Sequence, residues 1–267
     1  MAGTQSAVPS GRRRRRIAAA LLLVAVAVAL VIWLVPAPKH GPVKAAGATS
    51  HASFEAGGLT QFSQVNELHG RLAASGGLAH GRSGSAVATY DGSGANGYAR
   101  GIYNVHWKRG DDVAYSAAFY IPRATLAAVK GQVALMRWDD YPAHPSAANY
   151  GGVVIFVGDH RAHLIRNELG RTGDETDLVG AFDLPLDRWF TLEVRQRLGA
   201  DNARNEVYLD GRLIAKSLLP NIPGDRDVQR VRYGIAAIAS GAQTAPLRLW
   251  FDDATARPGA VASPDVP

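Results

Sequence analysis

Short runs in which apolar and polar residues alternate dominate the chain from about residue 85 onward. In the run from Val113 to Ile121 the apolar side chains fall on every second position, and Pro122 ends it. This period of two is typical of β-strands with one buried face. The same pattern predicts strands at Ala86–Tyr90, Tyr98–Trp107, Val133–Trp138, Val153–Val157, Ala162–Arg166, Trp189–Arg197, Glu206–Leu209, Arg230–Ile238 and Leu247–Asp252. So many strands with almost no helix predict an all-β antiparallel sandwich.

Two glycine-containing turns refine this prediction. Asp210-Gly211 lies between two short apolar runs and predicts a hairpin with a type I′ turn. The segment from Gly92 to Gly97 has the glycine spacing of a dinucleotide-binding loop. It leads into another strand and not into the helix that would hold a pyrophosphate, so it predicts a hairpin turn.

One segment has a different pattern, because Ile17 to Val35 is an unbroken run of 19 apolar residues. At helical rise it spans about 28 Å, close to the hydrocarbon thickness of a bilayer. Five arginines, Arg12 to Arg16, precede it. By the positive-inside rule the N-terminus is expected in the cytoplasm and the remainder outside the cell membrane. We therefore predict a single-pass signal anchor. A cleaved signal peptide and a secreted protein form the alternative, although the apolar run is longer than a usual signal-peptide core.

The predicted organisation has five parts: a basic cytoplasmic tail (1–16), the transmembrane helix (17–35), a stalk rich in Pro, Ala and Gly (36–52), the β-domain (53–257) and a loose C-terminal tail (258–267). The chain contains no cysteine, which excludes disulfides and cysteine-bound metals. The formal net charge of +6 comes from the N-terminal region, since residues 45–267 hold 22 basic and 23 acidic residues. The domain is therefore not expected to bind nucleic acid.

Several segments of the β-domain carry a family resemblance when they are taken in order. They are Phe54-Glu55-Ala56-Gly57, the strand from Trp189 to Arg195, the hairpin from Asn205 to Leu213, and the closing run from Leu249 to Asp253. Together they resemble the concanavalin A-like jelly rolls, in particular the laminin-G-like and polysaccharide lyase branches. Within that group, the segments Gly110–Pro122 and Leu135–Asp139 look most like lyases of the heparin-lyase type. The resemblance implies two packed sheets, one of which forms a groove for an extended glycan.

Strand alternation indicates which polar side chains could line that groove. The substrate-binding candidates are Arg100, His106, Trp138, Asp139, Arg166 and Arg195, with Trp138 as a sugar-stacking platform. A lyase acting on a uronic acid polysaccharide needs a cation or amide at the substrate carboxylate, a base and an acid. The catalytic candidates of these types are Arg137, Asn149, Tyr150 and His163.

Acidic residues give a weaker signal. A glycoside hydrolase on this fold would need paired carboxylates along one strand, and that pattern is absent. The cluster Asp174-Glu175-Thr176-Asp177 is interpreted as a solvated turn. In the resembled fold a structural calcium often joins the first and last strands, where Glu55 and Asp252 stand. Carboxylate oxygens suit calcium, so these two residues are its expected ligands.

The sequence leaves three functions open. The first is a membrane-anchored protein that binds a polysaccharide or cell-surface glycan. The second is a polysaccharide lyase that acts by β-elimination, which is the favoured activity if the protein is an enzyme. The third is a structural or protein-binding surface module, which an apolar or blocked groove would favour.

Overall fold

A computed structural model describes residues 49–55, 58–81, 83–93, 96–140, 150–156, 159–167, 175–222, 226–238 and 245–259. All of these residues belong to one compact unit, His40–Pro267. The predicted cytoplasmic tail, membrane helix and most of the stalk lie outside the described residues. Among those described, no helix has the length and apolar character needed to cross a membrane.

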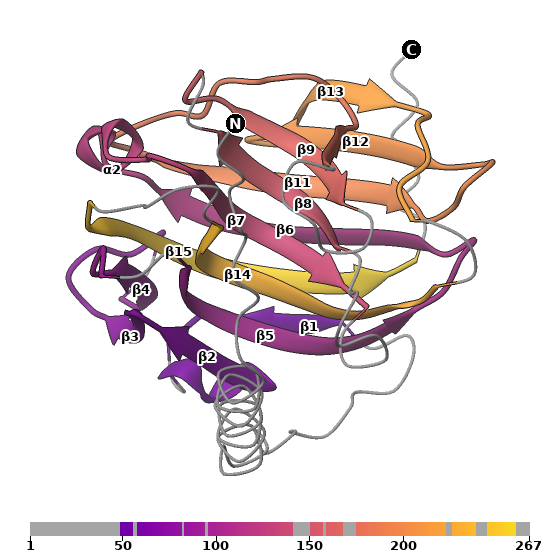
Figure 1. Cartoon of the computed structure of the whole chain (residues 1–267). Helices are drawn as coiled ribbons and strands as arrows, with labels where there is room; N and C mark the ends of the chain where they lie inside the picture. The colour runs from indigo at the N-terminus through magenta and orange to yellow at the C-terminus, as the bar shows by residue number, and fades with distance from the viewer. Residues whose placement is uncertain are drawn as a thin grey trace, which may run out of the picture. The chain divides into compact units, whose positions relative to one another are not determined.

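Two antiparallel sheets form the fold and lie one behind the other (Figure 1). The first has the strand order β13 (Arg212–Ser217), β12 (Arg204–Leu209), β11 (Trp189–Arg197), β6 (Asp112–Tyr120), β15 (Leu247–Pro258), β4 (Ser85–Tyr90) and β3 (Gly70–Ser75), with β1 (Ser50–Ala52) also paired to β15. We call this the eight-stranded sheet.

The seven-stranded sheet has the order β10 (Glu175–Asp177), β9 (Ala162–Asn167), β8 (Tyr150–Phe156), β7 (Gln132–Asp139), β14 (Val228–Ile238), β5 (Gly97–Trp107) and β2 (Gln64–Leu68). The helices described are short: η1 (Gly58–Gln61) and α2 (Arg123–Ala127). The prediction of an all-β antiparallel sandwich is therefore confirmed.

One continuous apolar core fills the space between the sheets. Tyr115 and Phe119 of β6 enter it from the eight-stranded sheet, and Tyr103 of β5 and Tyr233 of β14 enter it from the seven-stranded sheet. Because side chains alternate along a strand, the residues between these point outward. The two outer faces of the sandwich are thus the surfaces on which polar side chains gather.

The two turn predictions have different outcomes. Leu209 pairs with Arg212, and both Asp210 and Gly211 have positive φ, which confirms the predicted hairpin. The segment from Gly92 to Gly97 does not close a hairpin, because β4 pairs with β3 and β15 while β5 pairs with β2 and β14. This connection passes from one sheet to the other.

Candidate functional site

Four arginines gather around one carboxylate on the outer face of the seven-stranded sheet. Arg100 comes from β5, Arg137 and Asp139 from β7, and Arg230 and Arg232 from β14. The register of the central strands places them together, because Arg232 is opposite Arg137 and Arg230 is opposite Asp139. We call these five residues the arginine patch.

Positive charge in this patch exceeds the negative charge that accompanies it. Asp139 is fully buried and contacts the guanidinium of Arg232, and its Oδ2 lies 3.7 Å from a terminal nitrogen of Arg137. Arg100, which is only 8% exposed, makes no ion pair with any described residue. Burial lowers the pKa of Arg100 well below its ordinary value, and the neighbouring Arg232 and Arg137 lower it further. Burial, followed by Arg232, also lowers the pKa of Arg137.

Small residues beside the arginines leave a shallow hollow in the surface of the sheet. Ala134 and Ala236 line a shallow hollow together with Arg100, Arg137 and Arg232. Gly234, at φ 128°, belongs to the same lining, and a Cβ on it would lie 2.3 Å from the carbonyl oxygen of Ala99. The side chain of Arg137 is 17% exposed beside this hollow, so it is the arginine of the patch that a ligand lying on the sheet would meet first.

Tyrosine rings flank the patch on two sides. The guanidinium of Arg137 lies 4.3 Å from the ring centroid of Tyr150, and that of Arg100 lies 4.3 Å from the ring of Tyr98. The Tyr150 hydroxyl donates to Glu175 at 3.5 Å. Burial raises the pKa of Tyr150 to about 12, while the nearby Arg137 acts in the opposite direction. The phenol is therefore protonated at neutral pH and can donate a proton.

His163 lies further along the same face, in an open hollow of about 420 Å³ that Phe156, Glu175 and Asp177 also line. Its Nδ1 is 2.6 Å from Asp177 Oδ2, and its Nε2 is 3.1 Å from Asp159 Oδ2. Both ring nitrogens of His163 therefore lie within hydrogen-bond distance of a carboxylate.

The sequence-derived candidates divide into two groups. Arg100, Arg137, Asp139, Tyr150 and His163 lie on the outer face of the seven-stranded sheet, which brings them to one surface. His106 is on the same sheet, where it contacts Asp227 at 3.8 Å. Asn149 lies outside the described residues.

Three candidates lie elsewhere. Trp138 is 1% exposed, and its Nε1 donates to Gln196 in the core, so the structure corrects its assignment as a sugar platform. Arg195 belongs to the eight-stranded sheet, where it pairs with Glu193 through two 3.1 Å hydrogen bonds, and so it cannot line the same groove. Arg166 lies between Ile165 and Asn167, whose side chains point outward. Its own side chain therefore points to the inner face of the seven-stranded sheet.

Sequence reasoning missed several members of this face. Arg230 and Arg232 are separated by the core residue Val231, and this alternation could have assigned both arginines to the polar face. Glu175 and Asp177 were interpreted as part of a solvated turn. The structure instead places them in β10, paired with β9 and beside Tyr150 and His163.

The expected calcium ligands already accept hydrogen bonds. Glu55 accepts from the hydroxyl of Ser83 and from the backbone N–H groups of Ser83 and Gly84. Asp252 accepts from the N–H groups of Asp253 and His80. Within the part of the chain that the structure describes, no three acidic or histidine side chains form a metal-binding group. The calcium site stays a prediction, and a rise in Tm with added calcium that Asp252→Asn removes would support it.

Comparisons with known proteins identify the fold. No protein-family model matches the chain, and no curated protein matches its sequence. Among solved structures, the endo-β-1,4-glucuronan lyase of the fungus Trichoderma reesei superposes with a TM-score of 0.61 at 12% identity, over 79% of this chain and 94% of the lyase. The alginate lyase Aly36B gives a TM-score of 0.56 at 9% identity, over 80% of this chain and 98% of that protein.

A third similar structure is the cellulose-induced protein Cip1, with a TM-score of 0.53 at 16% identity, over 77% of this chain and 95% of that protein. At such low identities the similarity shows the fold alone. The two-sheet antiparallel sandwich that the sequence resemblance implied is therefore the fold that this chain shares with these structures.

Proposed function

We propose that the outer face of the seven-stranded sheet binds an anionic polysaccharide and that the arginine patch holds the carboxylate of a uronic acid unit. The observation that carries this proposal is the excess of buried arginine over buried carboxylate. Asp139 is the carboxylate that lies among Arg100, Arg137 and Arg232. A ligand carboxylate would add a counter-charge to those that the described residues provide.

The chemistry of the guanidinium group supports this assignment. Arginine presents a planar fork of N–H donors that matches a carboxylate in a bidentate arrangement. The Nε groups of Arg100 and Arg137 are buried and have no hydrogen-bond partner among the described residues. Buried donors that lack a partner are costly, so a ligand that accepts from them after the side chains reorient would gain affinity. The fold shared with a glucuronan lyase and an alginate lyase is consistent with such a ligand.

A binding measurement tests the proposal. We would titrate the 267-residue chain with β-1,4-linked tetraglucuronate and with cellotetraose, which differs by carrying CH₂OH in place of each carboxylate. We expect tetraglucuronate to bind more tightly and Arg137→Ala to weaken that binding about tenfold, because a charge-assisted hydrogen bond is lost. Arg212→Ala, at an exposed arginine on β13, is the control. Equal binding of the two sugars, or no effect of Arg137→Ala, would contradict the proposal.

The same face supports a second function, cleavage of the bound polysaccharide by β-elimination. In that reaction a base removes the C5 proton, a double bond forms between C4 and C5, and the bond from C4 to the leaving oxygen breaks. Arg137 would neutralise the carboxylate, and the protonated Tyr150 would give its proton to the leaving oxygen. Neutral His163, with its proton on Nδ1 beside Asp177, would accept the C5 proton at Nε2 after that nitrogen leaves Asp159.

Cleavage has its own test. Lyase products carry unsaturated sugar ends that absorb ultraviolet light. We would incubate the chain with glucuronan and alginate and follow this absorbance, with Tyr150→Phe as the variant that keeps the ring but lacks the proton. A rise that Tyr150→Phe removes would support the lyase. Binding of tetraglucuronate without any rise would leave a binding protein. A purely structural module is less favoured, because the described part of this face carries the charged arginine patch beside its small apolar cluster.

We further propose that residues 17–35 anchor the domain on the outer side of the cell membrane. The support for this is the 19-residue apolar run that follows five arginines. Fractionation of cells that express the chain with and without residues 17–35 tests the anchor. Digestion of intact cells by an added protease tests whether the domain is outside. Release of the unaltered domain into the medium would favour the secreted alternative.

A further inference from the structure

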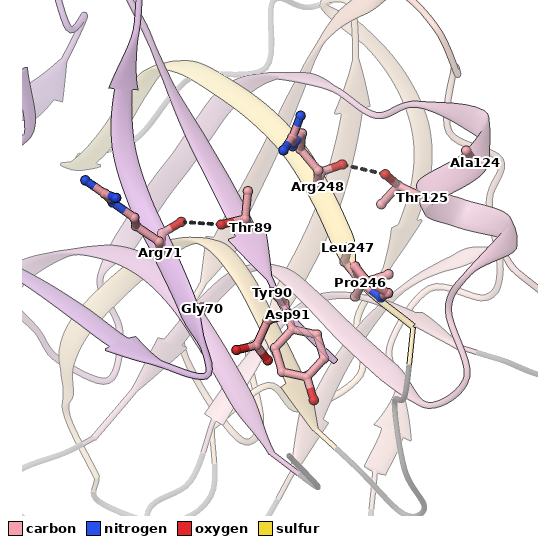
Figure 2. A pocket seen from close by; sticks show the side chains of 10 residues that line it. All are labelled: Gly70, Arg71, Thr89, Tyr90, Asp91, Ala124, Thr125, Pro246, Leu247 and Arg248. Carbon is pink, nitrogen blue, oxygen red and sulfur yellow. Dashed lines mark hydrogen bonds between the residues drawn. The ribbon is translucent and has the colours of Figure 1, made fainter. Parts of the chain in front are cut away.

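A second cavity, of about 650 Å³, lies on the eight-stranded sheet and shares no residue with the arginine patch (Figure 2). Its walls come from β3, β4, α2 and the start of β15. The polar side chains that line it are those of Arg71, Thr89, Asp91, Thr125 and Arg248. The functions proposed above do not use any of them.

Strand register builds one wall of this cavity. Arg248 of β15 is opposite Thr89 of β4, which in turn is opposite Arg71 of β3. Their neighbours Leu247, Ala88 and Leu72 are buried, so these three side chains point outward. Adjacent strands are about 4.8 Å apart, which puts the two arginine backbones about 10 Å apart with Thr89 between them. Figure 2 shows this order, with both guanidinium groups extending from the same wall.

Both arginines have guanidinium groups that are available to a ligand. Other arginines of the surface, such as Arg161 and Arg188, form ion pairs with aspartates. Neither Arg71 nor Arg248 makes an ion pair with any described residue. The guanidinium of Arg248 lies 5.9 Å from the ring centroid of Trp250, on the outer face of the same strand. The two cations of the wall thus lie next to a half-buried aromatic ring just outside the cavity lining.

The rest of the cavity offers hydrogen-bonding groups. Hydrogen bonds from Ser93 lower the pKa of Asp91, so its carboxylate is ionised and accepts hydrogen bonds at neutral pH. The hydroxyl of Thr89 donates to the Arg71 carbonyl and that of Thr125 to the Arg248 carbonyl. The two hydroxyl oxygens can therefore accept hydrogen bonds from a ligand. A ligand with a negative group for the two arginines and several hydroxyls for the acceptor oxygens would fit this cavity. An acidic sugar has both kinds of group.

We propose that this cavity is a second saccharide-binding site, which takes a sugar unit bearing a carboxylate or sulfate between Arg71 and Arg248. The ring of Trp250 would pack against the adjoining sugar. A lipid phosphate shares the anionic group but lacks the row of hydroxyls that Asp91 would bind. The proposal is independent of the arginine patch, because the two sites belong to different sheets.

Calorimetric titration of the 267-residue chain with tetraglucuronate tests this site. The variant Arg137→Ala weakens binding at the other face, and the double variant Arg71→Ala/Arg248→Ala weakens binding at the cavity. In the Arg137→Ala background we expect tetraglucuronate binding that the double variant weakens at least about tenfold. Arg212→Ala in the same background should leave it unchanged.

Each outcome has a distinct meaning. An affinity unchanged by Arg71→Ala/Arg248→Ala overturns the second site, whatever happens at the arginine patch. Binding that the double variant removes but Arg137→Ala does not alter supports the second site and contradicts the first. Competition by inorganic phosphate or by phosphatidylserine vesicles as strong as that by tetraglucuronate would overturn the assignment to a sugar. Equal binding of cellotetraose would overturn the requirement for an acidic group.

Discussion

Asp139 is the residue on which the arginine patch depends. It is fully buried, and both Arg232 and Arg137 point at its carboxylate. Attraction to this single carboxylate partly offsets the mutual repulsion of the arginines and the cost of their burial. Removing one partner of a buried ion pair is costly, because the remaining charge stays in a medium of low dielectric.

We expect Asp139→Asn to destabilise the domain by about 3–5 kcal/mol, because it leaves the buried arginines without their counter-charge. For a domain of this size that corresponds to a fall in Tm of about 6–20 °C. Thermal unfolding followed by circular dichroism measures it. Asp183→Asn is the control, since Asp183 also pairs with an arginine but its side chain is 85% exposed. Equal effects of the two variants would contradict the role of Asp139.

At the same scale, strand alternation explains which site residues could be predicted from the sequence. Arg137 and Asp139 flank Trp138 along the strand, so the three side chains cannot all face the same groove. The structure turns the two charged residues outward and Trp138 into the core. Arg195 could not be excluded in this way. Its outward orientation follows from alternation, but the sheet to which it belongs depends on strand order, which a single sequence does not contain.

At the scale of elements, the central strands were predictable and several edge strands were not. A central strand such as β6 has a fully buried inner face, and its alternation is clear. Edge strands such as β2 and β10 contain no buried residue. Their sequences therefore have no apolar alternation to detect, although β10 brings Glu175 and Asp177 to the candidate site.

A backbone irregularity in β14 also shapes this face. The pairing of β14 with β7 shifts register between Tyr233 and Ala236, and Gly234 lies within the shift at φ 128°. We expect Gly234→Ala to cost about 3 kcal/mol, because it combines a strained φ with a contact between its Cβ and the Ala99 backbone. Gly180→Ala is the matched control. Gly180 also has a positive φ, but its Cβ would meet no atom within 4 Å, so we expect about 1 kcal/mol.

Denaturant unfolding of both variants measures these differences. The same samples should bind tetraglucuronate less tightly when Gly234 is changed, because Gly234 lies opposite Arg100 in β5. A loss of stability that is no larger than that of Gly180→Ala would show that the backbone adjusts without strain. It would also contradict a role of this irregularity in shaping the hollow beside the arginine patch.

A buried polar network joins the two sheets behind the site. Gln196 of β11 accepts from the indole of Trp138 at 3.0 Å and from the hydroxyl of Tyr115 at 3.3 Å, and it donates to Asn205 at 2.8 Å. Trp138 lies between the two β7 residues of the arginine patch. The network therefore fixes the strand that carries Arg137 and Asp139.

We expect Gln196→Leu to destabilise the domain by about 3 kcal/mol or more, because three buried polar groups lose a partner. Gln229→Leu makes the same change on β14 at a partly buried residue whose amide has a single 3.3 Å contact, to His106. Urea unfolding of both variants gives the comparison. A small effect at Gln196 would mean that water or a rearranged side chain replaces the lost hydrogen bonds.

At the scale of the whole molecule, the two proposed sites lie on different sheets of one sandwich. The sheets pack against each other through their inner faces, so their outer faces point in opposite directions. A short oligosaccharide occupies one site at a time. A long polysaccharide reaches beyond one domain, and a domain with two sites can hold two polymer chains at once.

We therefore expect the 267-residue chain to cross-link long glucuronan, which light scattering at rising protein concentration would detect. Cross-linking requires both sites, so Arg137→Ala and Arg71→Ala/Arg248→Ala should each abolish the scattering increase while retaining some affinity for tetraglucuronate. This loss without loss of all binding distinguishes two-site binding from a general weakening, because multivalent assembly depends on the number of sites as well as on their affinities. Scattering that survives in either variant would mean that one face is enough. In that case self-association of the protein, and not its opposed faces, would connect the polymer chains.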